Sequence, residues 1–336
     1  MKWLTLAITQ IWHRVLNIRA KKLGILWVAI IVMSFPAYAK DQYLLVSSRE
    51  GGDILRYNVN TGNFVDVFIP AQASGINVSY GMTLGPDGNL YVTTGSTETY
   101  PNEDPRVLKF DSNTGEYLGT FASNIEMRGP TDVAFGPDGN LYVSDGLASK
   151  VFRFDGKTGE SLGVFATGNI NDNFRGLAWG PDGNLYVGPL QGYIDKFDGA
   201  TGASLGIFPT PPAGTMHNVT FGPDGLLYGS DYFGSSVYAY DIVTGELVKS
   251  FDGLNGALGM IFSDDGDLFV ANYFNYEIIK FDINSGSSGT VFADASTLSG
   301  PVDFVLLPIP EPSTNAMLLA GLGLIGLIMY RRKQHT

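Results

Sequence analysis

The chain has 336 residues, of which 33 are acidic, 21 are basic and none is cysteine. Without cysteine, disulfides are excluded, and stability has to come from the core and from closure of the fold. A hydrophobic content of 44% indicates a globular protein, and 43 glycines and 17 prolines favour many tight turns. We therefore expect an all-β protein.

Residues 1–39 have the organisation of a secretory signal peptide. A basic leader without acidic residues precedes 13 mostly apolar residues, Leu23 to Phe35, and the small residues Ala37 and Ala39 predict cleavage after Ala39. An uncleaved anchor is the alternative. It is disfavoured because 13 helical residues rise only about 20 Å, short of the roughly 30 Å of a bilayer's hydrocarbon core.

Residues 40–309 are then the exported body of the protein. They contain 13 basic and 32 acidic residues and carry a formal charge of −19. Such a surface repels nucleic acid and other polyanions, so no nucleic-acid partner is expected.

A repeat of a little over forty residues organises this body. A phrase of the type GPDGNLYV recurs, and a second phrase of the type FDGKTGESLGVF follows each copy. The five copies of the first phrase span residues 81–94, 132–145, 176–189, 218–231 and 259–272.

Each repeat predicts four antiparallel strands. In the second copy, an apolar strand ends at the turn Gly136–Gly139, where the aspartate caps the turn and the last glycine takes a positive φ. This interpretation of the Asp-Gly turns is favoured over calcium loops, because the alternating ligands and closing glutamate of an EF-hand are absent. The second, third and fourth strands are expected at 140–144, 151–154 and 161–165.

Four strands per repeat are typical of a β-propeller blade. A sixth copy is divided between the ends of the body, since residues 43–68 supply three strands and residues 300–307 supply the first. We therefore predict a six-bladed β-propeller over residues 43–307, closed by pairing of the N- and C-terminal strands.

The GPDGNLYV phrase and the end-to-end closure resemble the six-bladed NHL-repeat and gluconolactonase-like propellers. The resemblance implies the architecture and, for the lactonase branch, a divalent cation such as calcium on the axis, held by Glu, Asn and Asp. None of these ligands is retained, because the corresponding positions hold Ser299, Thr131, His217 and Leu258. This departure disfavours lactonase chemistry.

Polar residues at the predicted channel remain candidates for a site. Where other inner strands have glycine, Asp132, Asn218 and Asp303 could form a rearranged metal site. His217, the only histidine of the body, is the candidate general base, and the streptogramin-lyase branch of the resembling superfamily uses a histidine near the axis. Arg175 is expected to pair with Asp132 or, alternatively, to bind an anion at the channel mouth.

Aromatic residues gather in two loops that follow second strands, SDYFGSS and ANYFNYE. They are expected either to fill the core or to form exposed patches that stack on sugars or peptides. The binding candidates are Tyr232, Phe233, Tyr273 and Phe274, with Tyr276 beside them.

Residues 310–336 form the tail of the chain. Pro310, Glu311 and Pro312 precede 15 apolar residues, a short transmembrane helix of about 22 Å, and the basic cluster Arg331, Arg332 and Lys333. This arrangement resembles the PEP-CTERM sorting signal. The resemblance implies processing by an exosortase in bacteria that make exopolysaccharide.

Two functions remain open. The first is a non-enzymatic propeller that passes the secretion machinery, is held transiently in the inner membrane and reaches the cell surface or extracellular matrix, where it binds exopolysaccharide or a matrix protein. The second is a metal-dependent hydrolase or lyase that uses Asp132, Asp303 and His217.

Overall fold

The structure, a computed structural model, describes residues 42–71, 76, 80–95, 104–169, 171–208, 214–284 and 288–309. These residues all belong to one compact unit of the chain. The predicted signal peptide and the predicted tail lie outside the described residues. Within the described ranges, no helix is long and apolar enough to span a bilayer.

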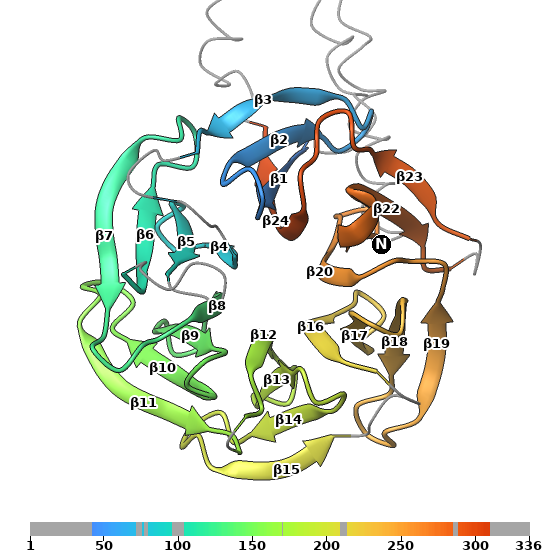
Figure 1. Cartoon of the computed structure of the whole chain (residues 1–336). Helices are drawn as coiled ribbons and strands as arrows, with labels where there is room; N and C mark the ends of the chain where they lie inside the picture. Colours follow the sequence, from blue (N-terminus) through green and yellow to red (C-terminus); the bar gives the residue numbers. More distant parts are fainter. Residues whose placement is uncertain are drawn as a thin grey trace, which may run out of the picture. The chain divides into compact units, whose positions relative to one another are not determined.

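In the described part of the chain, 24 strands form six four-stranded antiparallel sheets, which Figure 1 shows arranged radially around a common axis. Blade 1 contains β4 (Met82–Leu84), β5 (Leu90–Thr94), β6 (Arg106–Phe110) and β7 (Tyr117–Ser123). Blade 2 contains β8 (Pro130–Phe135), β9 (Leu141–Asp145), β10 (Lys150–Phe154) and β11 (Ser161–Thr167). Blade 3 contains β12 (Phe174–Trp179), β13 (Leu185–Pro189), β14 (Ile194–Phe197) and β15 (Ser204–Phe208).

The remaining blades complete the ring. Blade 4 contains β16 (Met216–Phe221), β17 (Leu227–Asp231), β18 (Ser236–Tyr240) and β19 (Leu247–Phe251). Blade 5 contains β20 (Ala257–Phe262), β21 (Asp267–Asn272), the 3-10 turn η2 (Tyr273–Asn275), β22 (Glu277–Asp282) and β23 (Thr290–Ala293). Blade 6, the closing blade, has the order β24 (Pro301–Pro308), β1 (Gln42–Ser48), β2 (Ile54–Asn58) and β3 (Phe64–Ile69). The predicted six-bladed propeller is confirmed.

The aspartate of the repeated turn caps it as predicted. Asp138 accepts the backbone N–H of Asn140 at 3.1 Å, and Gly139 has a φ of +79°. The same carboxylate also accepts the hydroxyl of Tyr142 at 2.9 Å. The tyrosine of the phrase is thus held by the turn that precedes it.

This tyrosine links four of the six blades to the next one. The Tyr142 ring lies edge-on to Trp179 of blade 3 at 4.8 Å. Edge-on pairs between a second-strand tyrosine and a first-strand aromatic of the following blade recur at Tyr91–Phe135, Tyr186–Phe221 and Tyr228–Phe262. Because such pairs add to the apolar burial between sheets, the repeated residues build the interfaces between blades.

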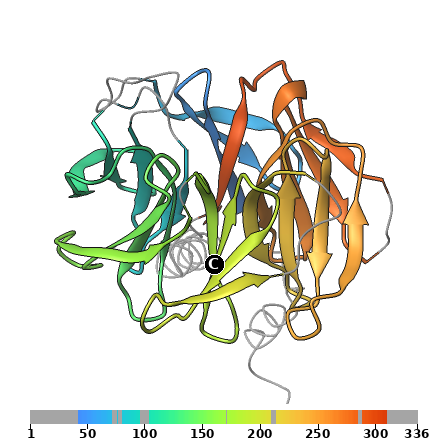
Figure 2. The same ribbon diagram turned by 60° about the horizontal axis from the view of Figure 1, so that its bottom comes forward.

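The closing blade joins the two ends of the body. Strand β24 pairs with β1, with Leu45 opposite Val305, and Figure 2 shows β24 in red-orange beside the blue N-terminal strands. Four apolar side chains of β24, Val302, Phe304, Val305 and Leu307, are each at most 5% exposed. The innermost strand of this blade therefore comes from the end of the body, and the other three come from its beginning.

Around the axis, glycine and a polar residue alternate from blade to blade. This axial ring consists of Gly81, Asp132, Gly176, Asn218, Gly259 and Asp303. A Cβ atom on Gly81 would lie 2.4 Å from the Cα of Asp132, and one on Gly176 would lie 2.6 Å from the Cα of Asn218. Side chains therefore fit at only every second position of the ring.

Two of the polar side chains connect neighbouring inner strands. Asp132 accepts the N–H of Leu177 in blade 3 at 2.9 Å, and Asp303 accepts the N–H of Met82 in blade 1 at 2.7 Å. Burial raises the pKa of Asp132 well above its usual range, and the charge of Asp303 raises it further. Burial raises the pKa of Asp303 to about 7, although N–H donors from Met82 and Phe304 act in the opposite direction. Near neutral pH the two carboxyls together hold at least part of a proton.

Removal of β24 should open the propeller. We expect a chain of residues 40–299 to lose cooperative thermal unfolding and to self-associate, because it loses four buried apolar side chains, worth about 2 kcal/mol each, and exposes the inner edge of β1. Circular dichroism melting and size-exclusion chromatography measure both effects. The control is residues 40–309, which keeps β24. A monomeric and cooperatively folded 40–299 chain would contradict the role of closure.

Substitution of Asp303 should change how stability depends on pH. Because the folded-state pKa of Asp303 is raised, its contribution is favourable near pH 4 and is lost as pH rises through about 7. Asp303→Asn keeps an oxygen acceptor for Met82 and cannot ionise. We expect the variant to be more stable than the wild type at pH 8, by on the order of 1–2 kcal/mol, and much less so at pH 5.

Urea unfolding at the two pH values tests this expectation. Asp111→Asn is the matched control with the opposite sign, because N–H donors from Thr114 and Asn113 lower the pKa of the exposed Asp111 carboxyl. A loss of stability in Asp303→Asn that is larger at pH 8 than at pH 5 would contradict the prediction. A cation that holds the carboxylates ionised would produce that result.

Candidate functional site at the channel mouth

The three predicted metal candidates lie together in the axial ring. Asp132, Asn218 and Asp303 all line a cavity of about 10 Å³ on the channel axis, room for one water-sized occupant. Oxygens of both carboxylates already accept backbone N–H groups. The described residues contain no group of three or more His, Asp or Glu side chains that could hold a metal. The axial ring thus joins neighbouring blades by hydrogen bonds. A calcium site there stays a prediction.

A second level of side chains surrounds the channel next to the axial ring. Its members each lie near the start of an inner strand and line the channel cavities: Tyr80, Thr131, Arg175, His217, Leu258 and Val302. Above this level lies a cavity of about 60 Å³, which we call the mouth cavity. Three residues from loops that follow second strands complete its walls: Arg49, Leu190 and Tyr232.

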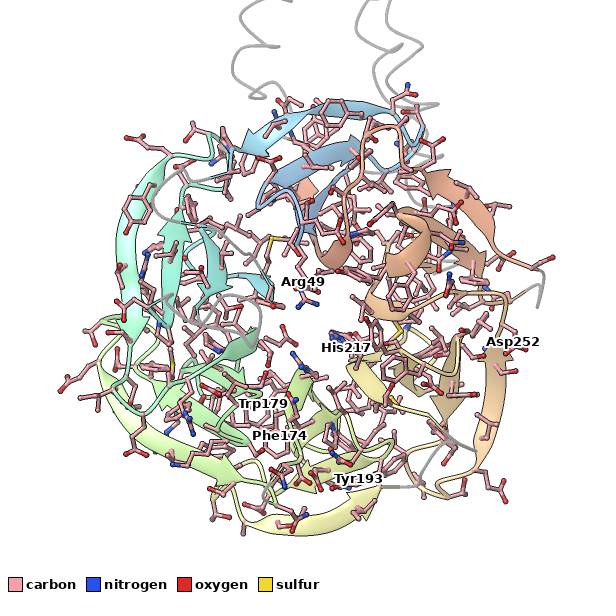
Figure 3. All side chains as sticks on the ribbon, viewed as in Figure 1. Arg49, Phe174, Trp179, Tyr193, His217 and Asp252 are labelled. Atoms are coloured by element: carbon pink, nitrogen blue, oxygen red, sulfur yellow. The ribbon has the colours of Figure 1, made fainter. Side chains whose placement is uncertain are left out.

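Arg49 is the candidate site residue that sequence reasoning missed. It follows β1 directly, the same place that Tyr232 occupies after β17 and Tyr273 occupies after β21. Its guanidinium lies 5.4 Å from the centre of the Tyr80 ring, a cation–π distance. Figure 3 shows Arg49 and His217 both directed into the central opening. An alignment of the closing blade on the other five could have found it.

His217 projects from β16 into the mouth cavity. Its Nδ1 is buried and has no hydrogen-bond partner among the described residues, and its ring lies 5.9 Å from that of Tyr232. Burial lowers the pKa of His217 well below its usual value, and the charges of Arg175 and Arg49 lower it further. The imidazole is therefore neutral at neutral pH and a weak base.

The favoured ion pair between Arg175 and Asp132 does not form. Among the ion pairs of the described residues, none joins these two side chains. The carboxylate of Asp132 instead accepts the backbone N–H groups of Val133 and Leu177. Arg175 lines both the mouth cavity and the cavity at the axial ring, so its position corresponds to the alternative prediction.

The predicted aromatic patches form one group, the aromatic cluster of Tyr232, Phe233, Tyr273 and Phe274. Tyr232 lies 4.6 Å from Phe233 and 5.2 Å from Phe274, measured between ring centres. Phe233 is 68% exposed and Phe274 is 47% exposed, whereas Tyr273 is only 9% exposed. The exposed-patch interpretation therefore applies to the two phenylalanines, and Tyr273 belongs to the core.

Glu50 fixes the base of this cluster. Its carboxylate accepts the hydroxyl of Tyr273 at 3.3 Å and that of Tyr276 at 3.0 Å. Burial raises the pKa of Tyr273 to about 12, although the charge of Arg49 opposes this, so its hydroxyl remains a donor. The closing blade and blade 5 thus hold each other at the channel mouth.

Comparisons with known proteins identify the tail and the fold. Residues 308–333 match the model of the PEP-CTERM protein-sorting motif. A stretch of 109 residues is 33% identical to peptidyl-glycine alpha-amidating monooxygenase B of Xenopus laevis. This stretch is 32% of the chain and covers only 12% of that relative.

Solved structures at low identity share the architecture. A chain of a nidogen/laminin complex has a TM-score of 0.65 at 16% identity, over 79% of this chain and 98% of its own. A protein of unknown function from Bacteroides caccae has a TM-score of 0.62 at 15% identity, over 80% of this chain and 100% of its own. Virginiamycin B lyase from Staphylococcus aureus reaches 0.50 at 15% identity, over 70% of this chain and 71% of its own. The protein is thus a six-bladed β-propeller that carries a PEP-CTERM sorting motif at its C-terminus.

Proposed function

We propose that the protein is an exported binding module, which an exosortase sorts through its tail and which binds a glycan or a protein at the channel mouth. The PEP-CTERM motif supports export and transient membrane anchoring, because proteins with this motif are exosortase substrates. Delivery to the cell surface or to an extracellular matrix of exopolysaccharide follows from the same proposal.

The aromatic cluster beside the mouth cavity is the observation that carries the binding role. Tyr232 belongs to both, since it lines the cavity and contacts Phe233 and Phe274. Exposed aromatic rings at a concave site are the usual anchors of recognition. Phe233 and Phe274 expose about half of their surface or more to water. Contact with water is unfavourable for apolar rings, and a bound ligand would cover them.

A binding role is favoured over the hydrolase or lyase alternative. His217 is a weak base in this environment, because burial and two arginines lower its pKa. The carboxylates of the axial ring accept hydrogen bonds from the backbone of neighbouring blades. The weak basicity of His217 and the backbone contacts of the two carboxyls favour binding or a structural role over catalysis.

Loss of the exposed rings should weaken ligand binding. We expect Phe233→Ala and Phe274→Ala each to weaken binding of the recognised ligand about tenfold, as for aromatic anchors of ordinary interfaces. A glycan array, followed by titration calorimetry with protein purified from cells that export it, measures the effect. Phe64→Ala on the outermost strand β3 is the matched control, since Phe64 is 41% exposed and lies outside the mouth cavity. Binding that survives both changes would refute the role of the cluster.

The sorting role makes a separate prediction about the tail. In a host with an exosortase, we expect mass spectrometry of the released protein to show that Arg331 and Arg332 have been removed. Replacement of Glu311 by Ala should leave the basic end attached and keep the protein with the membrane, whereas Ser313→Ala should be processed normally. A released wild-type protein with an intact C-terminus would rule out processing.

A further inference from the structure

The mouth cavity is a positively charged point in a strongly acidic body. Two arginines, Arg49 and Arg175, line it, and none of the described residues that line it is acidic. Residues 40–309 nevertheless have a formal charge of −19. Because guanidinium groups form strong, charge-assisted hydrogen bonds with anionic oxygens, a cavity lined by two arginines favours an anionic ligand.

The unpartnered imidazole is a second, independent sign of a ligand. The Nδ1 atom of His217 is buried without a hydrogen-bond partner among the described residues. Such a group loses its hydrogen bond to water and gains nothing in exchange, so a polar ligand atom stabilises it. As a neutral ring, His217 can donate Nδ1–H to an anionic oxygen or accept a hydroxyl.

The size and floor of the cavity select among anions. About 60 Å³ holds a few atoms, enough for a carboxylate and too little for a sugar ring or a polymer. The floor next to this cavity is the axial ring, which contains the carboxyls of Asp132 and Asp303. A dianion such as a phosphate monoester experiences more repulsion from these groups than a single carboxylate does.

The aromatic cluster determines what the carboxylate is attached to. The Tyr232 ring extends from the cavity wall to the exposed rings of Phe233 and Phe274, 4.6 Å and 5.2 Å away. A group joined directly to a carboxylate in the cavity would therefore lie against aromatic faces. A pyranose ring has an apolar C–H face that suits such a surface, and its hydroxyls point toward solvent and His217.

We propose that the mouth cavity binds the carboxylate of a uronic acid, with the sugar ring resting on Tyr232, Phe233 and Phe274. The inference rests on the proposed glycan-binding function and narrows it to acidic sugars. The acid is carried on an otherwise neutral glycan, because the −19 body repels a chain with a charge on every residue.

Calorimetric titration with three matched probes tests the proposal. The probes are xylotriose with one glucuronic acid side group, the methyl ester of the same compound, and unsubstituted xylotriose. With protein purified from cells that export it, we expect the free acid to bind at least tenfold more tightly than the ester or the neutral sugar. Inorganic phosphate should compete weakly. Equal binding of acid and ester, or strong competition by phosphate, would overturn the assignment of a carboxylate.

Variants locate the contact. Arg49→Gln should weaken binding of the acid at least tenfold and leave binding of the ester unchanged. The backbone N–H of residue 49 donates to the carbonyl of Gly300. This hydrogen bond does not depend on the side chain, so we expect the variant to fold. Arg128→Gln is the control, an exposed arginine outside the cavity walls. An unchanged affinity for the acid in Arg49→Gln would refute the site.

The same titrations separate this inference from the proposed function. If the neutral sugar binds as well as the acid and Phe233→Ala weakens both, glycan binding stands and the acidic specificity is wrong. If no sugar binds and a peptide with a free C-terminal carboxylate does, the carboxylate is correct and the sugar is wrong. Binding of none of these probes would contradict both proposals.

Discussion

The crowding of six inner strands at one axis is the constraint from which the rest of the structure follows. A Cβ atom on Gly81, Gly176 or Gly259 would lie within 3 Å of the next blade's backbone, so these positions exclude side chains. The positions between them retain Asp132, Asn218 and Asp303. Because both aspartates accept an N–H of the following inner strand, the crowded axis is also hydrogen-bonded across blades. Burial of two acids within reach of each other has a cost, which appears as their raised pKa values.

Residues that recur in the repeat stabilise the fold, whereas residues that depart from it lie at the channel mouth. The repeated aspartate and tyrosine hold the turns and the interfaces between blades, as the Tyr142 contacts with Asp138 and Trp179 show. Departures from the repeat gather at the channel mouth, where the loops after second strands carry Arg49 and Tyr232. A scaffold closed by β24 and β1 keeps these loops in fixed positions. Variation at the mouth therefore leaves the fold intact, which suits the proposed binding role of this surface.

The architecture could be predicted from the sequence, and much of the site could not. Blade number and closure follow from the repeat and its divided copy, because turn chemistry and alternation act locally. Whether an aromatic loop residue is exposed depends on neighbours far away in the chain, so Tyr273 is buried while Phe233 is exposed. The environment of Asp195 could not be predicted from the sequence either. This buried residue of the third strand β14 stands where the other blades have an apolar or aromatic residue. Burial and the nearby charge of Asp172 raise the pKa of Asp195 to about 7.

The charge distribution connects the fold to the proposed ligand. A body with a formal charge of −19 has a field that disfavours anions in general, and at physiological salt this field is screened beyond about 8 Å. Within the mouth cavity Arg49 and Arg175 lie on its walls, so they act on a ligand there at short range, where salt screens little. The long-range repulsion by the acidic body and the short-range attraction by the two arginines together select among anionic ligands. Dense polyanions meet the repulsion of the whole surface, whereas a single carboxylate on a neutral chain reaches the arginines with little penalty. Selectivity for sparsely charged glycans then requires no contact beyond those that the mouth already presents.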